Sequence, residues 1–221
     1  MSANPPEELK RIYEARFAEQ GDYRQAVWQV LIQMVFGRYL AEANAVLDLG
    51  CGYGEFINQV SVPDRYAMDL NPDLPYRVQS TVRCLPQDCS RTWPLGDGSL
   101  DLVFTSNFFE HLPDKGALGR TLDEAWRCLK PGGRLVALGP NIKYLPGEYW
   151  DFWDHHLPLT ELSLSEAMAT RNFAIERCED RFLPYTMARG PHYPLLFLRL
   201  YLRLKPAWRF FGKQFLVVGR K

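Results

Sequence analysis

The residues of this sequence that could do chemistry begin with glycines at alternate positions after an apolar run. Residues 45–49 read AVLDL, and Gly50, Gly52 and Gly54 follow them. Glycine is needed where a ligand approaches the backbone more closely than a Cβ permits, and where a turn requires unusual backbone angles. Asp48 precedes the first glycine; it is poorly placed for a pyrophosphate and suits the ammonium group of an amino acid, directly or through water. The pattern therefore predicts a ligand with an amino-acid moiety.

Three further segments follow these glycines along the chain. Asp69 ends a second apolar run, and residues 87–89 read QDC. Residues 99–114 (SLDLVFTSNFFEHLPD) form a third segment, which is followed by LKPGG at 129–133. In this order and at these spacings, the segments resemble the class I S-adenosylmethionine-dependent methyltransferases over roughly residues 45–140.

The resemblance implies S-adenosylmethionine as the cofactor and S-adenosylhomocysteine as the product. In the family, the acid at the Asp69 position holds the two ribose hydroxyls, and the acid at the Asp88 position accepts a hydrogen bond from the adenine amino group. Asp88 has a structural alternative as a helix cap or a surface acid. The cofactor-binding residues that the resemblance implies are Asp48, Gly50, Cys51, Gly52, Gly54, Asp69, Leu70, Asp88, Cys89 and Asn107.

An aromatic segment at 149–156 (YWDFWDHH) supplies the candidate catalytic residues. The segment after the fifth strand lines the acceptor pocket in this family, so the resemblance implies aromatic walls with His155 or His156 as general base. The alternative is that the aromatic rings are core and the histidines hydrogen-bond a loop. Arg16 and Arg24 could reach the cofactor carboxylate, although solvated charges on a helix are the expected role.

The sequence predicts no metal site. Glu110-His111 is similar to a pair that ubiquinone-type O-methyltransferases combine with an upstream Glu to hold a divalent ion, but the upstream residue here is Asn107. That difference removes an anionic ligand, so packing and capping of the next turn is the expected role. The five cysteines form no CxxC pair, which argues against structural zinc and against a disulfide framework.

Alternating strands and helices are expected to position these residues. Short apolar runs predict strands at 45–49, 65–70, 100–105, 134–138, 173–181 and 214–219. Helical spacing predicts helices within 6–40, from Glu55, at 118–129 and at 162–171, with an ordered loop at 141–160. This alternation predicts an α/β fold with a parallel, doubly wound sheet. The resemblance adds a Rossmann-like, mostly parallel seven-stranded sheet with helices on both faces and an antiparallel last strand.

The expected organisation is an N-terminal helical cap at 1–44 and a methyltransferase domain at 45–221, which contains the acceptor-site loop 141–160 and a basic amphipathic insertion at 184–213. The 26 basic and 26 acidic residues cancel overall, but residues 181–221 hold nine basic residues and no acidic ones. Basic residues among Trp, Phe and Leu suit an anionic membrane surface, and a cap over the active site is the alternative. With no signal-like N-terminus, the expected location is the cytoplasm, peripheral to a membrane if that surface is used.

The sequence thus predicts methyl transfer to oxygen or nitrogen of a small metabolite or glycan, and no nucleic-acid partner. Two alternatives belong to other classes. A nicotinamide-dependent oxidoreductase uses a similar sheet, but its turn has GxGxxG spacing rather than the GxGxG found here. A non-catalytic methyltransferase-like binding protein at a membrane surface would lack cofactor binding.

Overall fold

A seven-stranded sheet organises the protein. The computed structural model describes residues 6–17, 21–185 and 193–221, and its sheet has the strand order β3-β2-β1-β4-β5-β7-β6. Strand β7 runs opposite to the other six strands, so the predicted doubly wound sheet with an antiparallel last strand is confirmed. The strands are β1 (Ala45–Leu49), β2 (Asp64–Met68), β3 (Arg83–Leu85), β4 (Leu100–Ser106), β5 (Leu129–Pro140), β6 (Ala174–Glu179) and β7 (Gln214–Arg220).

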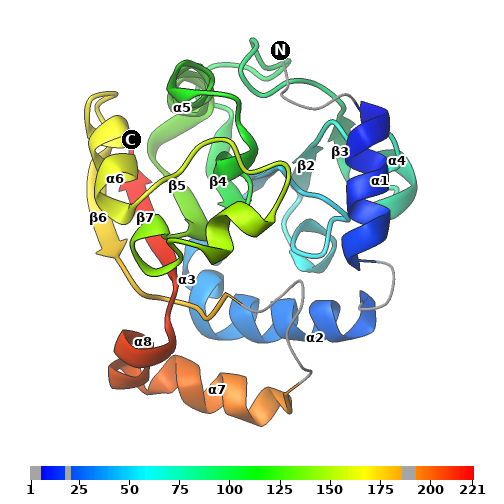
Figure 1. The fold of residues 1–221 in the computed structure, drawn as a ribbon. Helices are drawn as coiled ribbons and strands as arrows, with labels where there is room; N and C mark the ends of the chain where they lie inside the picture. The colour runs from blue at the N-terminus through cyan, green and yellow to red at the C-terminus, as the bar shows by residue number, and fades with distance from the viewer. Residues whose placement is uncertain (1–5, 18–20, 186–192) are drawn as a thin grey trace.

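Helices cover both faces because successive strand residues point to opposite sides. Leu47 and Leu135 pack toward α5 (Lys115–Cys128) and α6 (Glu161–Ala169). Val46 and Val136 belong to the opposite core. That core also takes side chains from α2 (Gly21–Leu31), α7 (Leu195–Arg203) and α8 (Lys205–Phe211), which lie together below the sheet in Figure 1. The alternating burial explains why the central strands are apolar almost throughout.

The N-terminal part is helical, as predicted. It comprises α1 (Pro6–Phe17), α2, a π-helical turn at Ile32–Phe36 and α3 (Gly37–Leu40). Lys10 on α1 forms an ion pair with Asp73, with 3.1 Å between Nζ and Oδ1, next to the short helix α4 (Leu74–Arg77). Helix α1 therefore lies near the β2 and β3 side of the sheet.

The helix predicted from Glu55 does not form. Only a 3₁₀ turn, η2 (Ile57–Gln59), separates the glycine turn from β2. Val60 is extended, and Val62-Pro63 follows it. A proline disfavours helical angles in the residue before it, and β-branched residues favour extended backbone, so the link is too short and too stiff for a helix. Strand β3, which has three residues, was not among the predicted ranges.

The predicted loop at 141–160 is ordered by two 3₁₀ turns, η4 (Ile142–Tyr144) and η5 (Glu148–Asp151). A third, η3 (Phe109–His111), follows β4. The main-chain carbonyl of Glu110 accepts hydrogen bonds from the N–H groups of His156 (2.8 Å) and Leu157 (3.0 Å), which fastens the loop to η3. Within the described ranges, none of the helices combines the length and the apolar character needed to span a bilayer.

Candidate functional site

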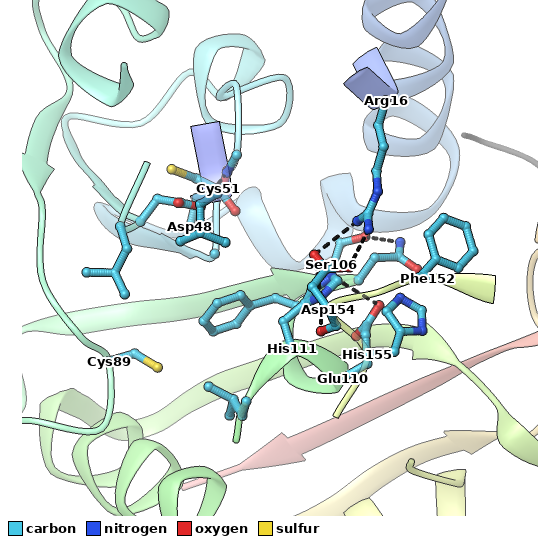
Figure 2. Close-up of a pocket in the computed structure, with 18 of the residues that line it drawn as sticks. Arg16, Asp48, Cys51, Cys89, Ser106, Glu110, His111, Phe152, Asp154 and His155 are labelled. Atoms are coloured by element: carbon cyan, nitrogen blue, oxygen red, sulfur yellow. Dashed lines mark hydrogen bonds and ion pairs between the residues drawn. The ribbon is translucent and has the colours of Figure 1, made fainter. Parts of the chain in front are cut away.

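A cavity of about 450 Å³ opens at the carboxyl ends of β1, β2 and β4. The strand order reverses between β1 and β4, and this switch point is where open α/β sheets bind ligands. The cavity is floored by strand ends and closed by α1, η3 and the 141–160 loop. Figure 2 shows its two ends, with Asp48 and Cys51 on one side and Glu110, His111, Asp154 and His155 on the other.

The glycine turn is held in a conformation that other residues rarely adopt. Gly50, Gly52 and Gly54 have φ values of 69°, 56° and 74°. A Cβ on Gly50 would also lie 2.1 Å from Cγ of Phe108, so both the backbone conformation and this close contact disfavour a side chain at position 50. Gly50 and Gly52 line the cavity, whereas Gly54 packs toward Val78 and does not. The backbone of the first two glycines is therefore exposed to a ligand.

Two buried carboxylates lie beside this turn, as predicted. Asp48 is 3% exposed, and burial raises its pKa well above the usual range, with the charge of Glu55 adding to the effect. Asp69 accepts hydrogen bonds from the N–H groups of Gly52 and Asn71, both at 2.8 Å, and burial raises its pKa as well. Buried carboxylates are stabilised by a cation or by hydroxyl donors, so both acids suit the ammonium and ribose groups of an adenosyl amino acid.

The remaining predicted cofactor residues also line the cavity. Leu70, Asp88, Cys89, Cys51 and Asn107 all contribute to its wall. Asn107 adopts a positive φ of 50°, and its side-chain Oδ1 is buried without a hydrogen-bond partner among the described residues. Burial raises the pKa of the Cys89 thiol to about 12, so this cysteine lines the cavity as an uncharged thiol.

The opposite end of the cavity is built on a charged chain of three side chains. Arg16 on α1 binds Asp154 through both guanidinium Nη atoms. Asp154 lies 3.2 Å (Oδ2) from Nδ1 of His111, and its main-chain oxygen lies 2.9 Å from the same nitrogen. Burial opposes ionisation of Asp154, but His111 and Arg16 outweigh it and hold its pKa well below the usual range. The arrangement fixes the ring of His111 and directs Nε2 away from Asp154.

Glu110 and His155 complete this end. Glu110 is 3% exposed, burial raises its pKa to about 7, and its Oε1 has no hydrogen-bond partner among the described residues. His155 stacks on Phe152, with 4.8 Å between ring centroids, and lies edge-on to His111 at 5.0 Å. Burial, followed by the charge of His111, lowers the pKa of His155 to about 3, so its imidazole is neutral.

The two predicted catalytic histidines therefore differ in position. His155 lines the cavity, whereas His156 is exposed and does not. The exposed rings of Trp150 and Trp153 lie outside the cavity wall, and of the aromatic residues in this segment only Phe152 lines it. Other aromatic walls come from Trp28, Phe104, Phe108 and Tyr185.

Sequence reasoning missed several residues at this end. Arg16 and Arg24 were expected to be solvated, but both line the cavity, and Arg24 forms an ion pair with Glu55 at 2.7 Å. Asp154 had no predicted role. Its position next to His155 and His156 was the available signal, but its partners lie 43 and 138 residues away. Such separations leave no periodic pattern in a single sequence.

Comparisons with known proteins agree with this geometry. Residues 47–137 match the family model described as "Methyltransferase domain". The chain is 32% identical over 117 residues to an uncharacterized 37.1 kDa protein in transposon TN4556 of Streptomyces fradiae, covering 48% of this chain and 33% of that protein. It is 25% identical over 179 residues to the demethylmenaquinone methyltransferase of Symbiobacterium thermophilum, covering 71% of each. The match thus spans a third of the length of the first relative.

The fold has solved counterparts. A SAM-dependent methyltransferase from Archaeoglobus fulgidus superimposes with a TM-score of 0.70 at 21% identity, covering 93% of this chain and 99% of that one. At this identity the likeness shows the fold, and it confirms the Rossmann-like arrangement.

Proposed function

We propose that the chain is a class I S-adenosylmethionine-dependent methyltransferase that methylates a hydroxyl oxygen or an amine nitrogen of a small metabolite or glycan. The match of residues 47–137 to the methyltransferase domain model and the shared fold support this proposal. The observation that carries the proposal is a single cavity with two chemically different ends. One end has an exposed glycine backbone and two buried acids, and the other has proton-handling side chains.

The first end fits the cofactor. Gly50 and Gly52 line the cavity in a conformation that favours glycine, and Asp48 and Asp69 offer carboxylates to a cation and to hydroxyls. When bound, S-adenosylmethionine supplies a methyl group on a positively charged sulfur. The chain's own contribution is to position donor and acceptor and to exclude water.

The second end fits an acceptor that must lose a proton. The side chains there that can accept a proton are Glu110, His111 and His155. Arg16 and Asp154 hold His111 in place. A hydroxyl group needs this help because it is a poor nucleophile until its proton leaves. The lowered pKa of His155 makes it a weak base. Burial also opposes protonation of His111, but Asp154 and Glu110 outweigh it and raise the pKa of His111, so His111 is the stronger base of the two.

The cavity also favours a small acceptor. Its volume falls within the range of small-molecule sites, and the 141–160 loop closes it on the acceptor side. The balanced overall charge gives no broad basic surface for nucleic acid. One relative is named a demethylmenaquinone methyltransferase and another a 2-methyl-6-phytyl-1,4-hydroquinone methyltransferase, so quinones and hydroquinones belong among the acceptors to be tried alongside sugars and amines.

Calorimetry and an acceptor screen test the proposal. We expect S-adenosylhomocysteine to bind the purified protein with one-to-one stoichiometry, and we expect at least one hydroxyl-bearing acceptor to raise its formation from S-adenosylmethionine. Thermal-shift measurements should show stabilisation by S-adenosylhomocysteine and none by NADH. Stabilisation by NADH alone would instead favour the oxidoreductase, and the absence of binding to either would favour a non-catalytic role.

A further inference from the structure

We propose that Glu110, His111 and His155 bind one divalent transition-metal ion at the acceptor end of the cavity. This inference rests on the proposed function, because the ion would hold and activate the acceptor. Each of the three side chains offers one donor atom, and these atoms all lie within 4.8 Å of one another. Oε1 of Glu110 lies 4.0 Å from Nε2 of His111. An ion about 2.0–2.2 Å from each donor would draw these atoms slightly closer together.

Unsatisfied polar atoms point to a missing partner at this place. Oε1 of Glu110 and Nδ1 of His155 are buried, and neither has a hydrogen-bond partner among the described residues. A buried polar atom without a partner is costly, and such atoms in native structures call for an explanation. A cation bound between them would satisfy both atoms at once.

The surroundings of His111 match those of a metal-binding histidine. Such a ring usually donates its second N–H to a carboxylate or a carbonyl, which fixes its orientation. Nδ1 of His111 has both kinds of partner in Asp154, and Arg16 fixes Asp154 in turn. Nε2 is thereby left for the ion. Figure 2 shows these side chains converging on the same point of the cavity.

The third ligand comes from the distant loop. The sequence predicted no metal because Asn107 stands where an upstream acid would be needed, but the fold brings His155 to Glu110 instead. The hydrogen bonds from the N–H groups of His156 and Leu157 to the carbonyl of Glu110 hold the loop close enough for this. This chain therefore builds its donor set from two segments rather than one.

Two imidazoles and one carboxylate form the donor set of many catalytic zinc sites, which keep a fourth position open. Zn²⁺ or a similar ion could bind the acceptor's hydroxyl oxygen there and lower its pKa. The proton of the hydroxyl then leaves to water, the oxygen forms a bond to the methyl carbon, and the carbon–sulfur bond breaks to give the neutral thioether. The ion is unchanged at the end.

Cobalt provides the test, because Co²⁺ bound in a four- or five-coordinate site absorbs strongly in the visible range. Chelator-treated, full-length protein is titrated with CoCl₂, and Zn²⁺ is then added. We expect one equivalent of Co²⁺ to produce the absorption and Zn²⁺ to abolish it. Because loss of an outer-shell partner alone costs about 10–100-fold in affinity, Glu110→Gln and His155→Phe should each weaken binding by more than about 100-fold.

His156→Phe is the matched control, since it changes the exposed neighbour of His155 and should leave the titration unaltered. Circular dichroism verifies folding of each variant, and the nearly isosteric Glu110→Gln keeps the test valid if His155→Phe is unstable. No cobalt spectrum, or equal binding by the wild type and Glu110→Gln, overturns the proposal. Binding of S-adenosylhomocysteine in EDTA is measured in parallel, so that failure of the metal site is distinguished from failure of the methyltransferase function.

An independent observation supports a second proposal: the surface of α7 and α8 binds an anionic membrane. Exposed apolar side chains gather on these two helices, with Phe210 77% exposed and Phe211 64% exposed. On α7 the exposed apolar residues are Leu196, Phe197 and Leu200, with Leu204 at its end. Residues 195–211 contain four basic residues and no acidic ones. Apolar and cationic side chains on one amphipathic surface match the interface of an anionic bilayer.

Co-sedimentation with vesicles tests this surface. We expect the protein to pellet with phosphatidylglycerol-containing vesicles at low salt, to pellet less with pure phosphatidylcholine, and to be released as salt rises. Phe197→Ser combined with Phe210→Ser should abolish pelleting, whereas Tyr76→Ser, which changes a still more exposed aromatic residue on α4, should not. The proposal is overturned if the double variant pellets as well as the wild type. It is also overturned if the wild type does not pellet and instead forms concentration-dependent dimers that the same two substitutions disrupt.

Discussion

Replacing Gly50 with alanine would test how the cofactor end of the cavity is built. The backbone at Gly50 has φ of 69°, and a left-handed residue with a Cβ costs roughly 1–2 kcal/mol. The new Cβ would also lie 2.1 Å from Cγ and 2.6 Å from Cβ of Phe108, and overpacking of this kind costs about 1–3 kcal/mol. We therefore expect Gly50→Ala to lower the free energy of unfolding by about 2–5 kcal/mol.

Gly98→Ala isolates the backbone part of this cost. Gly98 has a similar φ of 59°, but a Cβ there would meet nothing within 4 Å. Its replacement should cost only the roughly 1–2 kcal/mol of the left-handed conformation. The difference between the two variants then measures the contact with Phe108. Urea denaturation followed by fluorescence gives both values, and calorimetry with S-adenosylhomocysteine reports the effect on the cofactor site.

A double-mutant cycle makes the reasoning refutable. Phe108→Gly removes the ring and the Cβ that the alanine at position 50 would strike, so the two substitutions should be coupled by about 1 kcal/mol or more in the favourable direction. If Gly50→Ala is no more destabilising than Gly98→Ala, or if the two substitutions at positions 50 and 108 are simply additive, the close approach of Phe108 to the turn is refuted.

Three further outcomes are expected. Asp69→Asn should weaken binding of S-adenosylhomocysteine at least about 10-fold in calorimetry, because a hydrogen bond to a charged group contributes about 1.5–3 kcal/mol. The control is Asp64→Asn, at the exposed start of β2, which should bind normally. Asp154→Asn should weaken Co²⁺ binding about 10–100-fold while leaving the three ligands in place, and unchanged affinity would contradict its role in orienting His111. Burial alone would raise the pKa of Asp101, but hydrogen bonds from Lys130, Asn44 and Ala45 outweigh it and lower the pKa. Because the folded-state pKa is depressed, the ionised carboxylate stabilises the fold at pH values above the usual pKa of about 4, and this stabilisation is lost as pH falls toward the folded-state pKa. Asp101→Asn should therefore lower the free energy of unfolding by about 1–3 kcal/mol at pH 7 and by progressively less below pH 4, as measured by urea denaturation.

Local chemistry explains which parts of the fold were predictable. The turn at Gly50 and Gly52 requires glycine whatever lies elsewhere, so its position can be identified from five or six residues of sequence. The buried strands β1, β4 and β5 are apolar on both faces because helices cover both sides of the sheet. Their signal is therefore nearly continuous, and it survives without knowledge of the neighbours.

Other features depend on contacts that no local pattern encodes. The helix expected from Glu55 fails because the chain must enter β2 after Pro63, and the length of that link matters more than the helical preference of the residues in it. At the acceptor end, Arg16, Asp154 and His111 come from three separate segments. The sequence indicated that 149–156 belonged to the acceptor site, but only the fold separates His155, which faces the cavity, from its exposed neighbour His156.

The attachment of the loop to η3 has a consequence for how acceptor selectivity can change. The two N–H groups that bind the carbonyl of Glu110 belong to the peptide backbone, and the hydroxyl of Tyr149 anchors the carbonyl of Leu157 at 2.7 Å. Substitutions at Phe152 or Tyr185 leave these anchors intact. Natural drift or laboratory evolution can therefore remodel this wall of the cavity for differently shaped acceptors, one residue at a time, while the support beneath it persists.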